Sequence, residues 1–325
     1  NLDIIITISK ASLSASLEVS TQLKTASDYF SVSQIGTPSP IFVIDAFESG
    51  PVDFKHSVSE NSLFYFNRKD GQEQQFGKYD LGTNTHTTRL FNGLPNFDKQ
   101  IELIDGEIFG ISAFQIAKMD YDLANDPVLS DCNNSLESWY TLASYGDTIF
   151  SIGGYGPFEA NIISTYNEGS NSFVPFTTMP NQISRADALI YESSLYVFGG
   201  MYVDPQTQET SIYEDVYQFS VFDGQLLGNW SLPTSVIETY VARQDNLIFI
   251  GGRADTDVTD DTIFTRPFFG VFDTQDNSFV EIDISQFFPE SYTMRSMTVA
   301  NGKVYFAFRL PTESGLTVFE ADLLP

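Results

Sequence analysis

Two arginines, Arg185 and Arg295, occupy matching places in two copies of a repeated segment. In each copy a turn, an aromatic residue and a proline come first, and the arginine stands just before an apolar strand hairpin. Guanidinium groups can hold a carboxylate through two parallel hydrogen bonds. Two interpretations of Arg185 and Arg295 stay open: they bind an anionic group, or they form structural ion pairs between neighbouring repeats.

Residues suited to catalysis or to metal binding are few. The chain has two histidines, His56 and His86, and one cysteine, Cys132, which lies in a polar segment. They do not suggest a nucleophile with its base or a set of transition-metal ligands. Acidic residues gather at 120–131 and 255–261, but without the spacing of an EF-hand calcium loop. We predict no catalytic residue, no metal and no cofactor.

The charge balance excludes some classes of partner. The chain carries 43 acidic and 16 basic residues, for a net charge of −27. Nucleic acids and anionic membrane surfaces require clustered cations, which are missing here, and no apolar run has the length of a transmembrane segment. The chain begins with Asn1, as expected if a signal or lipid-anchor segment has been removed. We expect a monomeric, extracytoplasmic protein of the periplasm or cell surface.

The elements that position these side chains are recurring strand hairpins. Three copies end in a glycine pair, at residues 149–154, 195–200 and 248–252, and degenerate copies begin at residues 63, 108 and 304. A polar turn before each copy is typical of a hairpin, and repeats of about 40–55 residues are typical of propeller blades. The pattern predicts an all-β fold, a β-propeller of four-stranded antiparallel blades.

The order of these motifs resembles the kelch repeat of the galactose oxidase/kelch-like superfamily, in a divergent bacterial form. In kelch blades a glycine pair closes the second strand, a tyrosine lies in the third, a tryptophan begins the fourth and an arginine precedes the next blade. The resemblance covers residues 51–325. It departs from the family at the fourth strand, where only Trp230 is kept and Phe173 and Phe279 replace the tryptophan elsewhere.

The resemblance also implies which side chains surround the mouth of the central channel. In kelch proteins the residue before the innermost strand often lies there, and counting back from each hairpin gives one candidate per blade. They combine cations, hydrogen-bond acceptors and an indole on which a sugar or aromatic ring can stack. The predicted ligand-binding ring consists of Asp53, Asp98, Trp139, Arg185, Glu238 and Arg295. For Trp139 the alternative is packing between blades.

The repeat divides the chain into an N-terminal stretch, 1–50, and blades at about 51–93, 94–135, 136–181, 182–233, 234–287 and 288–325. The last blade lacks a fourth strand, and a propeller must close to cover its sheet edges. We expect residues 4–8 to fill that place and the N-terminal strands to add a further blade. Seven blades are therefore favoured over six.

Two functions from different classes fit this sequence. The favoured one is a non-enzymatic binding propeller that recognises a protein, peptide or glycan at the central funnel and at two long loops, 201–211 and 253–266, because loops on a rigid scaffold often bind. The alternative is a carbohydrate-active propeller similar to the sialic acid mutarotases. That activity would need an acidic residue and an arginine facing each other across the channel mouth.

Overall fold

Local turn chemistry explains why the predicted hairpins form. Strands β9 (Ile101–Ile104) and β10 (Glu107–Ile111) are joined by Asp105 and Gly106, with φ of 48° and 88°. Asn301 and Gly302 join β27 (Thr293–Ala300) to β28 (Lys303–Arg309) with φ of 53° and 75°. Two consecutive left-handed residues are typical of the tight turn that matches the twist of paired strands, and Asn, Asp and Gly adopt it most readily.

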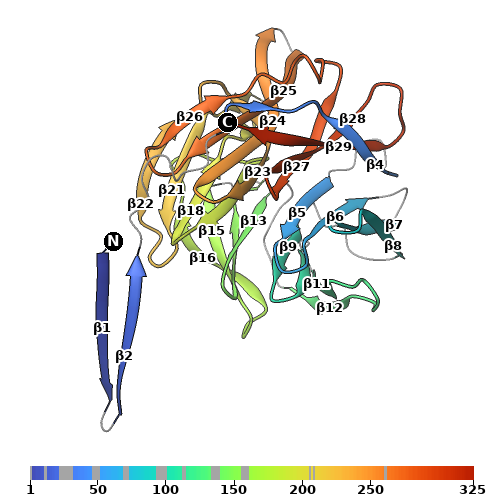
Figure 1. The fold of residues 1–325 in the computed structure, drawn as a ribbon. Coiled ribbons are helices and arrows are strands. Elements are labelled where there is room, and N and C mark those ends of the chain that lie inside the picture. The colour runs from blue at the N-terminus through green and yellow to red at the C-terminus, as the bar shows by residue number, and fades with distance from the viewer. Residues whose placement is uncertain are drawn as a thin grey trace.

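These hairpins assemble into a β-propeller of four-stranded antiparallel blades (Figure 1). The structure is a computed structural model that describes residues 2–10, 13–21, 32–45, 52–68, 73–92, 101–111, 115–132, 140–154, 161–204, 206–207, 209–259 and 262–325. Within these residues six blades are present. The predicted architecture is confirmed, and the expectation of seven blades is wrong.

The blades follow one another along the chain, each running from its innermost to its outermost strand. Blade 1 contains β5 (Val52–Ser57), β6 (Ser62–Arg68), β7 (Glu73–Asp80) and β8 (Thr85–Asn92). Blade 2 adds β11 (Gln115–Asp120) and β12 (Val128–Asp131) to β9 and β10. Blade 3 contains β13 (Thr141–Tyr145), β14 (Thr148–Ile152), β15 (Ile162–Asn167) and β16 (Ser172–Thr178).

Blade 4 contains β17 (Asp187–Tyr191), β18 (Ser194–Phe198), β21 (Asp215–Ser220) and β22 (Leu226–Ser231). Blade 5 contains β23 (Val236–Gln244), β24 (Leu247–Thr259), β25 (Thr262–Asp273) and β26 (Ser278–Glu281). Blade 6 begins with β27, β28 and β29 (Leu316–Leu324).

An N-terminal strand completes blade 6, but it is not the one expected. Strand β4 (Ser39–Ile44) pairs with β29. The short β3 (Gln34–Ile35) pairs with the last two residues of β29, Leu323 and Leu324. Residues 4–8 lie in β1 (Leu2–Lys10), whose one partner in the described chain is β2 (Leu13–Thr21).

The chain connection explains this correction. Strand β4 directly precedes the innermost strand of blade 1, and neighbours in sequence are usually neighbours in space. The N-terminal strands therefore contribute one missing strand instead of a whole blade.

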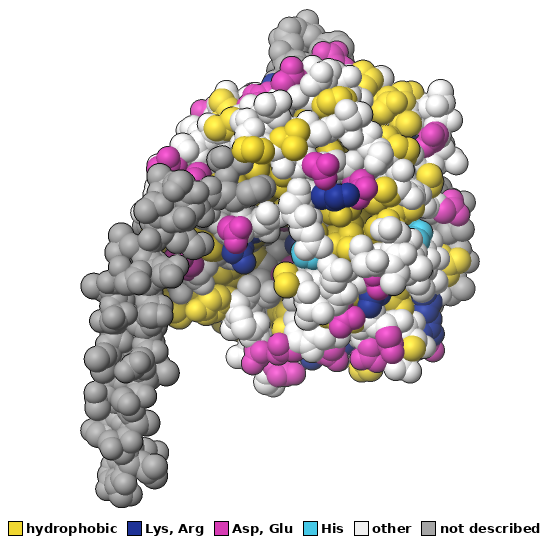
Figure 2. All heavy atoms as spheres, in the orientation of Figure 1, with side chains coloured by type: hydrophobic (Ala, Val, Ile, Leu, Met, Phe, Trp, Pro, Cys, Tyr) yellow, Lys and Arg dark blue, Asp and Glu magenta, His cyan; other side chains and the backbone are white. Residues whose placement is uncertain are grey.

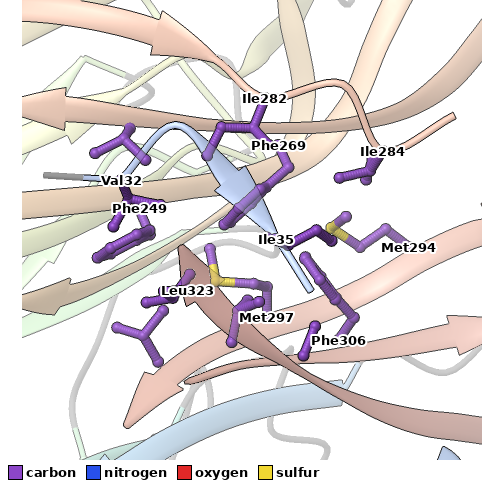
Figure 3. Close-up of a cluster of buried hydrophobic side chains, with 14 of the residues drawn as sticks. Val32, Ile35, Phe249, Phe269, Ile282, Ile284, Met294, Met297, Phe306 and Leu323 are labelled. Atoms are coloured by element: carbon purple, nitrogen blue, oxygen red, sulfur yellow. The ribbon is translucent and has the colours of Figure 1, made fainter. Parts of the chain in front are cut away.

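The innermost strands close into a ring around the channel. Each of β5, β9, β13, β17, β23 and β27 contacts the next, and β27 contacts β5 again. Large side chains fill the wedge between blades. Between blades 5 and 6, Phe249 and Phe269 pack near Met297 and Phe306, with Ile35 among them (Figure 3).

The two segments predicted as long loops contain paired strands. Residues 201–211 carry β19 (Met201–Val203) and most of β20 (Thr210–Ile212), which pair with each other. Residues 253–266 continue β24 and β25, whose pairing extends to Thr259 and Thr262. These segments are therefore extended hairpins on the scaffold. The described residues include no helix that could cross a membrane.

Ring closure by β4 can be tested with two neighbouring residues of that strand. Ile44 is fully buried against blade 1, whereas the Val43 side chain is 57% exposed. We expect Ile44→Ala to lower the free energy of unfolding by about 2–5 kcal/mol because it leaves a cavity. Val43→Ala is the matched control and should change it by less than about 0.5 kcal/mol. Denaturant unfolding measures both, and equal effects would contradict a closing role for the buried face of β4.

Candidate functional site at one mouth of the central channel

Four side chains from three blades meet at the end of the channel where the innermost strands begin. Glu238 is 5% exposed and accepts from Arg185, Arg253 and Arg295. The nitrogen–oxygen distances are 2.9 Å for Arg185, 3.0 Å for Arg253 and 3.4 Å for Arg295. We call these four residues the arginine mouth. Three guanidinium groups converge there on one carboxylate.

Backbone irregularities aim these side chains at one another. The register of β23 shifts between Ile237 and Tyr240, which brackets Glu238, and that of β27 shifts between Met294 and Ser296, which brackets Arg295. Such β-bulges redirect side chains and are frequent near functional sites. Arg185 and Glu238 also adopt φ of 55° and 54°. A left-handed backbone is uncommon outside Gly, Asn and Asp, and costs of order 1–3 kcal/mol.

The glycine pairs found in the sequence support this end of the channel. A Cβ atom on Gly200 would lie 2.7 Å from the carbonyl oxygen of Ser184, directly before Arg185. A Cβ atom on Gly199 would lie 2.9 Å from the carbonyl oxygen of Val236 in blade 5. The first glycine thus lies against the next blade and the second against the entry of its own blade. Because real Cβ atoms do not approach so closely, larger residues would displace the segments that carry the arginine mouth.

Tyr240 and Arg253 each place a buried hydrogen-bond donor at this mouth. Within the described chain, neither the Tyr240 hydroxyl nor Nε of Arg253 makes a hydrogen bond. Tyr240 is 8% exposed, and burial, followed by the charge of Glu238, raises the pKa of its hydroxyl well above the usual range. The tyrosine therefore stays protonated at neutral pH. Buried donors without partners are rare, and they point to a water molecule or a ligand acceptor.

Deeper in the channel, polar side chains join neighbouring blades. Asp187 accepts from the backbone N–H of Val241 at 2.7 Å and from the Thr141 hydroxyl at 2.7 Å. Asp53 of blade 1 accepts from the backbone N–H of Ile101 in blade 2 at 2.8 Å. Each carboxylate satisfies an innermost strand that has no further strand beside it on the channel side. These contacts hold the ring of strands together.

A lysine compensates part of this buried negative charge. Lys55 lies 3.4 Å from the Glu102 carboxylate and also interacts electrostatically with Asp53 and Asp187. Burial, offset in part by Lys55, raises the pKa of Asp53 to about 7. The pKa values of Glu102 and Asp187 are also raised, again chiefly by burial. The middle of the channel therefore holds protons more tightly than a solvent-exposed acidic surface would.

Three residues of the predicted ring, Arg185, Glu238 and Arg295, come together in the arginine mouth. Asp53 instead lies among Lys55, Asp187 and Glu102, bonded to blade 2. Asp98 and Trp139 lie outside the described residues.

Sequence reasoning missed Arg253 and Tyr240. Arg253 directly follows the glycine pair Gly251–Gly252, a place that marks the channel mouth equally well. Tyr240 carries no comparable signal, because a tyrosine in an apolar strand is most often packed in the core.

Comparison with known proteins does not assign the chain to a family. No family model and no curated protein matches the chain. The kelch assignment, the bacterial origin, export and the monomeric state therefore stay predictions. The function has to be argued from the site.

The compensating role of Glu238 leads to a stability prediction. Glu238→Gln removes the carboxylate shared by three arginines and should destabilise the fold by about 2–3 kcal/mol. This is below the ~3–5 kcal/mol of a fully buried pair, since the arginines are partly exposed. The matched control is Glu281→Gln, which breaks the surface ion pair with Arg266 and should cost at most about 1 kcal/mol. Equal losses in chemical denaturation would contradict the special position of Glu238.

The raised pKa of Asp53 gives a pH dependence with a definite sign. The unfolded carboxyl titrates near 3.8 and the folded one near 7, so the folded state binds more protons between these values. The contribution of Asp53 to stability is complete below pH 3.8 and is lost as the pH rises towards 7. Asp53→Asn should remove this loss. As the pH rises, the free energy of unfolding of the variant should therefore increase relative to that of the wild type by up to about 1.4 kcal/mol per pH unit. Unfolding measured from pH 4.5 to 7.5 checks the slope, and parallel curves would refute it.

Proposed function

We propose that this protein is a binding propeller that recognises a carboxylate group of its ligand at the arginine mouth. The observation that carries the proposal is the convergence of three guanidinium groups on the single buried carboxylate of Glu238, beside a buried tyrosine hydroxyl that has no hydrogen-bond partner among the described residues. A guanidinium group presents several N–H donors in a planar fork, so one that contacts Glu238 still has donors to offer a second carboxylate.

Charge supports an anionic ligand at this place. The protein as a whole carries a net charge of −27, so its long-range field repels anions. The arginine mouth reverses that sign locally, since three cationic groups surround one carboxylate. A ligand carboxylate bound there would bring the local charges closer to balance. The neutral Tyr240 hydroxyl and Nε of Arg253 would each gain an acceptor.

The same geometry favours binding over catalysis. Glu238 accepts from arginines through both carboxylate oxygens, at 2.9 and 3.0 Å on one and 3.4 Å on the other. A general base must have an oxygen free to take a proton from the substrate. Tyr240 does not supply a base, because its raised pKa keeps the hydroxyl protonated. We therefore assign these groups to recognition. The carboxylate belongs to an acidic side chain or chain end of a peptide or protein, or to an acidic sugar of a glycan.

The test is a binding assay on two arrays, one of acidic peptides with their amidated counterparts and one of sialylated, uronic and neutral glycans. The wild-type protein should retain probes with a carboxylate more strongly than their neutral counterparts. For the best probe, Arg253→Lys and Arg295→Lys should weaken binding at least tenfold in calorimetry, because lysine keeps the charge but loses the fork. Arg266→Lys on the outer strands is the matched control and should bind as the wild type does.

Retention of neutral probes alone, or unchanged affinity in both arginine variants, would overturn the proposal. The arrays also decide which source supplies the carboxylate. A catalytic role would be recognised by NMR. The wild type would accelerate the exchange between sialic acid anomers over the uncatalysed rate, and Tyr240→Phe would not accelerate it. That result would replace binding by the carbohydrate-active alternative.

A further inference from the structure

The opposite end of the channel contains a cavity that the arginine mouth does not share. Its volume is about 260 Å³, and its walls come from the innermost strands of all six blades. Val58 on its rim is 84% exposed, so the cavity opens to solvent beside the hairpin turns. Figure 2 shows a hollow near the middle of one face of the molecule, with a histidine and a basic side chain beside it. We call this space the turn-side cavity.

One wall of the turn-side cavity is polar. Glu102 accepts a hydrogen bond from the Ser144 hydroxyl through Oε1 at 2.9 Å, and its Oε2 lies 3.4 Å from Nζ of Lys55. Within the described chain, Nε2 of His56 is buried and makes no hydrogen bond, whereas the buried Oε2 of Glu102 has the ion pair with Lys55 as its one partner. A carboxylate oxygen can only accept, and a neutral imidazole offers one donor and one acceptor nitrogen. A ligand that satisfies Glu102 must therefore donate a hydrogen bond.

The other wall is apolar and comes from blades 4, 5 and 6. Leu189, Ile190, Val241 and Val299 line it, with Ala242 between them. A ligand that fills the cavity would place hydrogen-bonding groups on one side and C–H groups on the other. Small-molecule sites usually combine a mainly apolar lining with a few placed polar groups. At about 260 Å³ the cavity lies just below the ~300–1,000 Å³ of sites for drug-sized ligands, so the ligand is small.

Charges around the turn-side cavity are close to balance. Lys55 and Arg243 contribute two positive charges to its lining, against Glu102 in the wall and Asp187 close to Lys55. Asp53 also lies close to Lys55, and because burial raises the pKa of its carboxyl to about 7, it is less fully ionised at neutral pH than an exposed aspartate. A charged ligand would upset this balance in a partly buried site, which is costly. The site is therefore suited to a neutral ligand.

We propose that the turn-side cavity is a second binding site that takes a neutral polyhydroxylated molecule of about the size of a monosaccharide. Hydroxyl groups both donate and accept, so one such ligand serves Oε2 of Glu102, Nε2 of His56 and Nζ of Lys55 together. Its C–H face lies against Leu189 and Val299. The site shares no lining residue with the arginine mouth, and it stands whether or not that mouth binds a carboxylate.

The test uses the full chain and a panel of neutral monosaccharides and polyols, with acetate and lactate as charged comparators. Binding is followed by saturation-transfer NMR and then by calorimetry. At least one neutral sugar should bind in the millimolar range or tighter, and the charged comparators should not compete with it. Ala242→Leu, which fills the cavity, and Glu102→Gln, which removes the charged acceptor, should each weaken that sugar at least tenfold. Arg253→Lys at the opposite mouth should leave its affinity unchanged.

Thermal unfolding of each variant shows whether it is folded. If Ala242→Leu does not fold, Glu102→Gln and the smaller change Ala242→Val decide the outcome. The proposal is overturned if no neutral sugar binds, if a bound sugar keeps its affinity in the folded cavity variants, or if acetate or lactate displaces it.

Discussion

The pairing of β4 with β29 is the constraint on which the rest of the molecule depends. Without it, blade 6 would have three strands, and β29 would expose the edge that β4 now pairs, which would be open to pairing with other chains. The same contact joins the two ends of the chain, since Ile44 lies opposite Leu316 and is buried against blade 1. Closing the ring places Ser296 of blade 6 against Phe54 of blade 1, whereas Arg295 meets Glu238 across the contact between the consecutive blades 5 and 6. The channel and both of its ends exist because the ring is closed.

The polar groups of the channel differ in how far the fold itself occupies them. In its middle, Asp53 and Asp187 each bind the backbone of a neighbouring innermost strand, so these carboxylates are occupied by the fold itself. At the arginine mouth, the bulges and left-handed residues represent strain that the surrounding blades must hold in place. In the part of the chain that the structure describes, buried polar atoms without a hydrogen bond lie at both ends, the Tyr240 hydroxyl at one and Nε2 of His56 at the other. Groups that the fold leaves unsatisfied are the ones able to serve a ligand.

Much of the fold was predictable because hairpins are local. Turn residues such as Asn301–Gly302 and the glycine pairs mark where strands turn and where blades meet, and both signals lie within a few residues. The closing strand could not be chosen in this way, because residues 4–8 and β4 are both apolar and the partner lies at the other end of the chain. Arg185, Glu238 and Arg295 were found by counting from the hairpins. Arg253 was missed because it lies in the second strand of its blade and not before the first. The bulges that orient Glu238 and Arg295 could not be predicted, because no sequence pattern marks them.

The origin of blade 6 from both ends of the chain also orders events during synthesis. Strand β4 leaves the ribosome before any blade is complete, whereas β29 is made only after blades 1–5. At ~5–20 residues per second, the delay between the two strands is on the order of tens of seconds. During that time five blades can form, but β4 waits without its partner. Until β29 is made, the ring therefore stays open, and the two strands of blade 6 that come from distant parts of the sequence meet last.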